Sequence, residues 1–210
     1  MTSRTRTSPR TTLAVLIGIG VAMATNSALF GTQLMFDARP FSEVAATPQH
    51  VTYYVVLLVL LAALAQVLPR LGAVTGGTGR SFPDGVLVLL GVGVFFDAAT
   101  RFGEAFMVPF LAAHAPELLD DTPSTVLMSA MVTSWVLYLV GLVTLGVVAY
   151  RRRIFPRTAA VLLIVGGVTV PAIGPLSGLL IGTALAWGGY AARRATPWSV
   201  PVRVSDSAVV

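Results

Sequence analysis

Long apolar runs separated by short polar or glycine-rich segments dominate the chain. The runs cover about residues 13–36, 51–68, 85–112, 124–150, 157–170 and 176–192. An α-helix needs about 20 mostly apolar residues to cross the hydrocarbon core of a bilayer. The pattern therefore predicts an all-α polytopic membrane protein, a bundle of six transmembrane helices within residues 13–192. The polar tails at residues 1–12 and 193–210 are expected to be disordered.

Composition points to the same class. The chain is 55% hydrophobic and 11% charged, whereas soluble domains carry about 25% charged residues. A transmembrane barrel would need alternating segments of about ten residues, and the sequence has none. Because cysteine and lysine are both absent, disulfides, thiolate catalysis, cysteine metal sites and Schiff-base chemistry are excluded. We expect a multi-pass protein of the cell membrane without a cofactor.

The arginines predict the orientation of the bundle. With six crossings, twelve of the 14 arginines fall in the N-terminus, residues 69–84, residues 151–157 or the C-terminus. Because cytoplasmic loops carry an excess of basic residues, both termini are expected to be cytoplasmic. The high pI of about 10.4 then reflects topology, and no nucleic-acid partner is expected. The cluster Arg151, Arg152 and Arg153 fits a topological anchor, a contact with anionic lipid, or both.

Two features of the apolar runs have alternative interpretations. Residues 22–24 resemble a signal-peptidase site, but hydrophobicity resumes beyond them, which favours an uncleaved first helix. Small residues recur every four positions in the first and sixth helices, a spacing that lets backbones approach closely. Packing within the chain is the simpler interpretation, and a homodimer is the alternative. The small residues are Gly20, Ala24 and Ala28 in the first helix and Gly178, Gly182 and Ala186 in the sixth.

Three charged side chains lie within the third apolar run. Asp97, Arg101 and Glu104 are spaced four and three residues apart, so a regular helix places them on one stripe. Charged residues inside a membrane span normally face protein or water and indicate a functional site. The stripe fits a structural staple in which Arg101 pairs with both acids, or a ligand site in which Asp97 or Glu104 is the working carboxyl. A helix ending near Thr100 would leave the charges at the membrane interface.

Other polar residues could complete a site. Asn26 lies near the middle of the first helix and could contact a ligand, although an interhelical hydrogen bond is the simpler role. His50, His114 and Glu117 could form a metal site, but they lie at helix ends far apart in sequence, so no metal is expected. The fifth and sixth helices are short, which predicts a depression on the side of Asp97 unless the helix continues through Pro171.

Two short motifs suggest a family. One is the R-x-x-E element at residues 101–104, and the other is the basic-proline segment at residues 153–157, followed by small and apolar residues through Gly166 and Gly167. In both, the chain resembles uncharacterised six-helix integral membrane proteins of microbes, a group of unknown function. The resemblance implies a six-helix bundle, assigns no reaction, and has no counterpart for Asp97.

The leading hypothesis is a binding, sensing or accessory protein with a small outward-facing polar pocket. Its ligand-binding residues would be Asp97, Arg101, Glu104 and Asn26. One alternative is a membrane enzyme that protonates a lipophilic substrate through Asp97 or Glu104, as membrane terpene cyclases do. That role needs a protonated carboxyl, which the neighbouring Arg101 opposes. The other alternative is a small dimeric transporter or channel in which the acids relay protons or cations.

Overall fold

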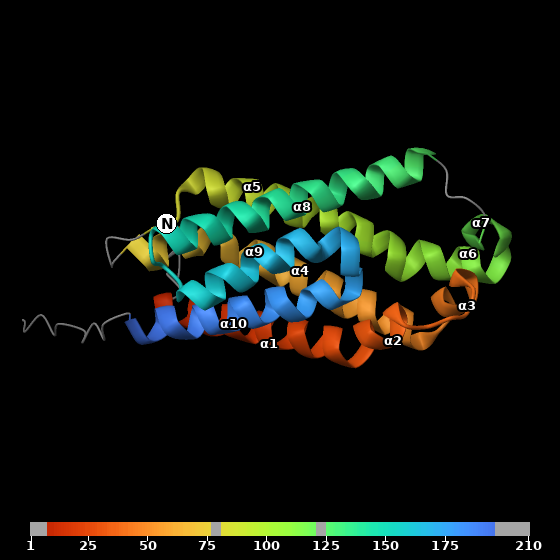
Figure 1. Cartoon of the computed structure of the whole chain (residues 1–210), viewed down its shortest axis with the longest axis horizontal. Helices are drawn as coiled ribbons and strands as arrows, with labels where there is room; N and C mark the ends of the chain where they lie inside the picture. The colour runs from red at the N-terminus through yellow and green to blue at the C-terminus, as the bar shows by residue number, and fades with distance from the viewer. Residues whose placement is uncertain (1–7, 77–80, 121–124, 196–210) are drawn as a thin grey trace, which may run out of the picture.

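The fold is described from a computed structural model that defines residues 8–76, 81–120 and 125–195 (Figure 1). Within these residues the chain is helical and has no β-strand, so the prediction of an all-α fold is confirmed. The longer helices are α1 (Pro9–Asn26), α4 (Pro48–Gly76), α5 (Asp84–Phe102), α8 (Thr125–Arg151), α9 (Arg157–Ile173) and α10 (Ser177–Ala195). The shorter helices are α2 (Thr32–Met35), α3 (Phe41–Ala45), α6 (Val108–His114) and α7 (Glu117–Asp120).

Five helical segments are long and apolar enough to cross a membrane. They are Pro9–Met35, Pro48–Gly72, Asp84–His114, Met128–Arg151 and Arg157–Ala195. Large apolar side chains are exposed along the same segments, among them Val59, Val88, Phe95 and Val168. An exposed apolar surface of this extent is unusual for a protein in water and is consistent with insertion into a membrane.

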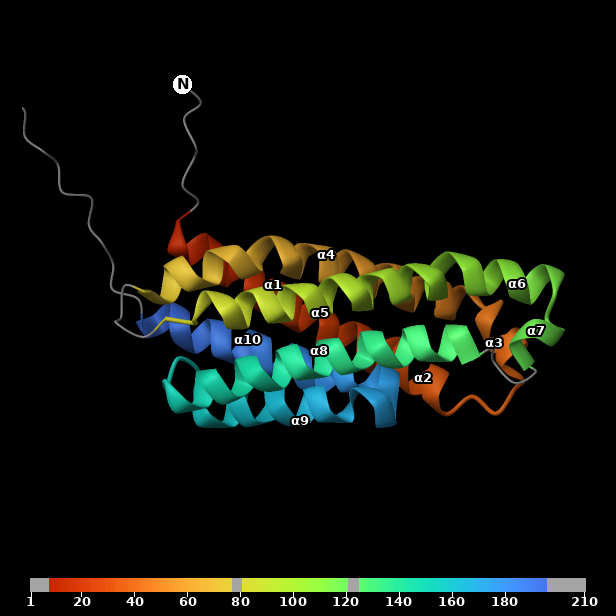
Figure 2. The ribbon, with the colours of Figure 1, turned by 90° about the horizontal axis from the view of Figure 1, so that it is seen from above.

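The long helices pack side by side as an elongated bundle (Figures 1 and 2). Each long helix packs against the next one along the chain, in the order α1, α4, α5, α8, α9 and α10. Helix α10 also packs against α1, which closes the ring. The beginning of α1 and the end of α10 lie at one end of the bundle, here named the terminal end, and α3, α6 and α7 lie at the opposite, distal end (Figure 2). Fully buried leucines fill the terminal half: Leu13, Leu16, Leu61, Leu64, Leu90, Leu142, Leu145 and Leu163.

The closest helix contact joins α1 to α10 through the small residues that the sequence singles out. A Cβ atom added to Gly20 would lie 2.5 Å from the Gly182 carbonyl oxygen and 2.5 Å from the Ala186 nitrogen. One added to Gly182 would meet the backbone of Ala24 at the same distance. The two stripes of small residues therefore pack against each other inside this chain, because only residues without a side chain allow the backbones to come so close.

Several helix ends differ from those expected. Helix α1 begins at Pro9, where the Ser8 hydroxyl accepts a hydrogen bond from the Thr11 backbone N–H, so residues 9–12 are helical. Helix α4 continues through Pro69 to Gly76 because Leu71, beyond the proline, is buried in the core. That burial offsets the backbone hydrogen bond that proline removes. Helix α10 extends to Ala195, so residues 193–195, expected in the disordered C-terminal tail, are helical as well. The rest of the two expected tails, residues 1–7 and 196–210, lies outside the described residues.

The α9–α10 hairpin reverses well short of the distal end (Figures 1 and 2). Helix α9 continues through Pro171 for two residues to Ile173, and a 3₁₀ turn at Gly174–Leu176 leads into α10. Gly174 has a φ of 35°, a conformation that glycine adopts without a Cβ clash. The other helical segments extend past this turn, so α9 and α10 do not cover the distal part of the bundle.

Candidate functional site

A buried ion pair on α5 forms the centre of the candidate site. The Arg101 Nη2 atom donates to Asp97 Oδ1 at 3.0 Å, and Nε donates to Oδ2 at 3.4 Å. The side chains are 13% and 2% exposed. The two residues are four positions apart on a regular helix, which places both on the face turned toward the bundle interior. Both carboxylate oxygens of Asp97 therefore face the guanidinium group.

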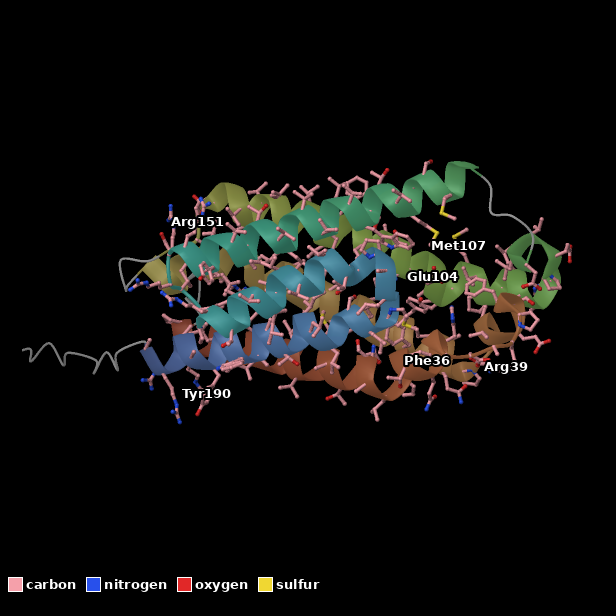
Figure 3. The ribbon with its side chains drawn as sticks, in the orientation of Figure 1. Phe36, Arg39, Glu104, Met107, Arg151 and Tyr190 are labelled. Atoms are coloured by element: carbon pink, nitrogen blue, oxygen red, sulfur yellow. The ribbon has the colours of Figure 1, made fainter. Side chains whose placement is uncertain are left out.

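Glu104 lies in the interior without joining this pair. The helix changes to a π-helical turn at Gly103–Met107, so the regular spacing expected for the three charges stops at Phe102. Within the described residues no ion pair links Glu104 to Arg101. Instead the Glu104 Oε2 atom lies 3.7 Å from His50 Nε2, and that nitrogen lies 3.1 Å from the Glu104 carbonyl oxygen. Figure 3 shows Glu104 inside the bundle, with Arg39 and Arg151 toward opposite ends.

The beginning of α4 connects the four residues singled out in the sequence. Asn26 Nδ2 donates to the Tyr53 carbonyl oxygen at 3.1 Å, and the Arg101 guanidinium lies 5.6 Å from the centre of the Tyr54 ring. His50 lies beside Glu104. The α4 residues that contact Asn26, Arg101 and Glu104 therefore lie close together at the beginning of this helix. The sequence analysis considered His50 only as a possible metal ligand and missed Tyr54, because both lie near a helix end. Their spacing of four residues on one face was the available signal.

Tyr53 ties this turn to the α9–α10 hairpin. Its hydroxyl donates to the Pro175 carbonyl oxygen at 3.1 Å, and the Tyr53 and Tyr54 rings pack edge to face with their centres 4.8 Å apart. The hairpin turn is therefore held beside the ion pair. Because α9 and α10, the fifth and sixth predicted helices, are short, the turn between them lies at the site.

Several buried polar atoms around the site have no hydrogen-bond partner. Among the described residues these are Asn26 Oδ1, Ser27 Oγ, Glu104 Oε2 and Ser134 Oγ. A buried polar atom left unpaired costs about 1–3 kcal/mol, and native proteins contain few of them. Ser27 begins a second π-helical turn, Ser27–Gly31, and such turns occur frequently at functional sites. The concentration of these atoms in the distal half is typical of a site that admits water or a ligand.

Two cavities lie on either side of the α4 turn. The inner one, of about 20 Å³, is lined by Met23, Tyr53, Leu57, Asp97, Arg101, Tyr138, Val170, Gly174, Ser177, Gly178 and Ile181. That volume is enough for about one water molecule. The outer one, of about 340 Å³, is lined by Leu34, Met35, Asp37, Arg39, Phe41, Val44, His50, Tyr54 and Pro175. We name it the distal pocket.

The acidic residues at and near the distal pocket have hydrogen-bond partners. The Arg39 Nη2 atom donates to Asp37 Oδ2 at 2.7 Å, and these hydrogen bonds from Arg39 lower the pKa of Asp37 to about 2. Nearby, Asp120 accepts hydrogen bonds from the Ser42 hydroxyl at 2.6 Å and the Ser42 backbone N–H at 3.0 Å. These hydrogen bonds, the one from the hydroxyl more than the one from the backbone, lower the pKa of Asp120. Both carboxyls are therefore ionised at neutral pH, and Asp120 ties α7 to α3.

The two histidines have different surroundings. His50 is 2% exposed and packs against Tyr54, with ring centres 4.7 Å apart. His114 is exposed, stacks on Phe110 and places Nδ1 2.9 Å from the carbonyl oxygen of that residue. No group of three or more metal-ligating side chains occurs in the described ranges. These residues therefore do not form the histidine and carboxylate cluster that a metal site would need.

Comparisons with protein-family models, curated proteins and solved structures give no match for this chain. The fold and site define a helical protein with five segments able to span a membrane and a polar, partly hollow distal half. The resemblance noted in the sequence stays an interpretation of its motifs, and the function is argued from the site alone.

Proposed function

We propose that the chain is a six-span integral protein of the cell membrane, with both termini cytoplasmic. The reversal at Gly174 supports this count because it divides the last apolar segment into two antiparallel helices, α9 and α10. Helix α9 has 17 residues and would extend about 25 Å at 1.5 Å per residue. The arginine distribution supports the orientation. The distal end would then face outward.

We propose further that the distal pocket binds a small ligand from the outer side. One observation carries this proposal: the hairpin stops beside the ion pair and leaves a pocket of about 340 Å³ whose wall includes His50 and Tyr54. Ligand sites are typically about 300–1,000 Å³, mostly apolar, with a few polar groups that fix orientation. Through His50 and Tyr54, an occupant would contact the side chains that touch Glu104 and Arg101.

The lining favours a neutral amphiphile with a ring or short chain and one hydrogen-bonding end. Leu34, Phe41 and Val44 supply apolar contacts, and the His50 and Tyr54 side chains offer hydrogen-bonding atoms. Asp37 and Arg39 neutralise each other, so the mouth presents no uncompensated charge that would select an ion. A single-ring molecule fits, since a cavity of about 150 Å³ accommodates benzene.

Binding agrees better with the geometry than catalysis. Acid catalysis requires a carboxyl that holds a proton in an apolar cavity. The Asp97 oxygens instead accept hydrogen bonds from Arg101. Glu104 has an oxygen without a donor but is not among the residues that line either cavity near the site.

Transport is the second candidate, favoured by one specific observation. Polar side chains from several helices meet near irregular helical turns, as they do in transporters with interrupted helices. Asn26, Asp97, Ser134 and Ser177 come from different long helices and are all buried. The leucine core of the terminal half opposes a continuous polar path in this conformation. Transport would therefore require a second arrangement of the helices.

Two partner proposals accompany this function. Contact of Arg151 and Arg153 with anionic lipid is proposed from their place at the terminal end, whereas Arg152 donates to the Ser81 carbonyl oxygen at 2.8 Å. A homodimer would need a face other than the small-residue stripes, which α1 and α10 use between themselves. The exposed phenylalanines of α5, Phe95 and Phe96, offer such a face.

The pocket is tested with three probes that share a ring and differ in charge: benzyl alcohol, benzoate and benzylamine. The full chain in lipid nanodiscs should gain about 2–4 °C in Tm at saturating benzyl alcohol, and less with either ion. Leu34→Trp fills the pocket and should abolish this gain. Val88→Trp adds the same side chain at a position 65% exposed on α5 and should retain it.

A second variant guards against misfolding of Leu34→Trp. Phe41 is 44% exposed at the pocket wall, so Phe41→Ala should fold and weaken the benzyl alcohol shift through loss of ring contact. An unchanged shift in both pocket variants would refute binding at this pocket. Equal shifts for the three probes in the wild type would refute the preference for a neutral ligand.

A further inference from the structure

A second hollow lies at the terminal end of the bundle, between α1 and α4. It has a volume of about 160 Å³ and is lined by Thr11, Thr12, Val15, Ala63, Gln66, Val67 and Arg70. The two helices run antiparallel and pack side by side (Figure 2). We name this hollow the terminal groove.

Along the helix axes, the residues that line the groove change from polar near the terminal end to apolar further into the bundle. Thr11, Thr12 and Arg70 lie nearest the terminal ends of their helices, and Val15 and Ala63 lie one or two turns further in. A turn of helix advances about 5.4 Å. In a bilayer that the two helices cross, the polar groups would therefore lie at the depth of a lipid headgroup, and the apolar groups at that of the first carbons of an acyl chain.

Arg70 brings an uncompensated positive charge to the groove. It is exposed, and no described acidic side chain forms an ion pair with it. Neither α1 nor α4 contains a single aspartate or glutamate. A guanidinium group without a carboxylate partner at the membrane surface is complementary to phosphate, which it can bind through two parallel hydrogen bonds.

Thr12 gives an independent indication of a ligand. It is 4% exposed and lines the groove, and its hydroxyl makes no hydrogen bond within the described part of the chain. A threonine hydroxyl inside a helix usually bonds to the carbonyl four residues earlier, as Thr32 and Thr133 do. The free hydroxyl of Thr12 is thus available to donate to an oxygen in the groove.

We infer that the terminal groove is a binding site for a phospholipid with an anionic headgroup, in the leaflet next to the chain termini. Arg70 binds the phosphate, the Thr11 and Thr12 hydroxyls donate to headgroup oxygens, and an acyl chain runs along Val15 and Ala63. This site is distinct from the distal pocket and from Arg151 and Arg153. It does not depend on the proposed function.

Native mass spectrometry of the full chain in detergent tests the site, with phosphatidylglycerol and phosphatidylcholine of identical acyl chains as probes. The wild type should retain one phosphatidylglycerol in preference to phosphatidylcholine. Arg70→Gln should lower phosphatidylglycerol retention about tenfold, and Thr12→Val, which keeps the shape but removes the hydroxyl, should lower it by a smaller factor. Arg151→Gln is the matched control for loss of one surface arginine and should retain the lipid.

Each alternative result overturns the inference. Loss of lipid in Arg151→Gln but not in Arg70→Gln would place the lipid at the other arginine cluster. Equal retention of the two lipids would remove the headgroup specificity. Displacement of the bound lipid by millimolar inorganic phosphate would identify a free-anion site. Because Thr12→Val removes no charge, its result decides the question even if Arg70→Gln unfolds.

Discussion

At the scale of single residues, the described part of the chain holds two buried carboxyls with different surroundings: Asp97 is hydrogen-bonded to an arginine, and Glu104 lies 3.7 Å from His50 Nε2 without a hydrogen bond to its Oε2 atom. Asp97 has Arg101 as its partner, whereas the Glu104 Oε2 atom has no donor. Removing one member of a buried pair leaves the other charge uncompensated, which destabilises a protein far more than removing both. The carboxyl of Asp97 in α5 and that of Glu104 in the π-helical turn after it are therefore expected to respond differently to the same substitution.

Asp97→Asn should lower the free energy of unfolding by about 3–5 kcal/mol, because Arg101 would remain buried without its counter-charge. Glu104→Gln should change it by less than about 1 kcal/mol, because no hydrogen bond to the Oε2 atom is lost. The double variant Asp97→Asn/Arg101→Met should recover most of the loss. Denaturant unfolding of the three variants in mixed micelles measures the order, and an Asp97→Asn protein as stable as Glu104→Gln would contradict it.

The sequence predicted part of the site. The step from Asp97 to Arg101 follows from helical spacing alone, but the position of Glu104 depends on the π-helical turn at Gly103–Met107, which no residue pattern announces. The contacts of His50 and Tyr54 depend on how α4 is rotated against α5. That rotation is set by packing across the bundle, so the sequence of one helix does not contain it.

At the scale of elements, helix contacts rather than helix propensity fix the bundle. The α1–α10 contact is made backbone to backbone at Gly20 and Gly182. In a lipid-embedded protein such contacts supply the packing energy that the hydrophobic effect supplies in water. A single methyl group at the contact should therefore separate the two helices.

Gly20→Ala should reduce stability by about 1–3 kcal/mol because its Cβ would overlap backbone atoms that cannot move independently. Gly18→Ala is the matched control on the same helix, since a Cβ there has nothing within 4 Å. Alanine is favoured over glycine in a helix by about 1 kcal/mol, so the control should be neutral or stabilised. Thermal unfolding of both variants in one detergent checks the prediction, and equal Tm values would show that the contact is not tight.

The helices themselves were largely predictable, because apolar runs are long and their ends carry proline, glycine or arginine. The prediction placed the end of the second helix at Leu68, before Pro69, yet α4 continues to Gly76. Burial of Leu71 on the far side of the proline explains the difference, and burial is a property of the packed bundle. The depression beside Asp97 was inferred from a helix that ends before Pro171, but α9 continues through Pro171 to Ile173. Asp97 lines only the inner cavity of about 20 Å³, and the larger distal pocket lies beyond it, against Pro175.

At the scale of the whole molecule, the interior is asymmetric along its long axis. Leucines fill the terminal half, and the buried polar groups Asn26, His50, Asp97, Glu104 and Ser134 all belong to the distal half. An apolar half that closes one side and a polar half that opens toward the other suit a receptor for a ligand arriving from the distal side. The direction of this asymmetry in the membrane depends on the topology.

The topology can be measured directly because the chain contains no cysteine, so one introduced cysteine is the only thiol. With six crossings, Ser8→Cys, Arg153→Cys and Arg194→Cys should all be protected from a membrane-impermeant maleimide in intact cells and react after permeabilisation. Glu43→Cys should react in both conditions. If Arg157–Ala195 crossed only once, Arg153→Cys and Arg194→Cys would lie on opposite sides and react differently. Labelling of Ser8→Cys in intact cells, with Glu43→Cys protected, would instead invert the bundle and turn the distal pocket toward the cytoplasm.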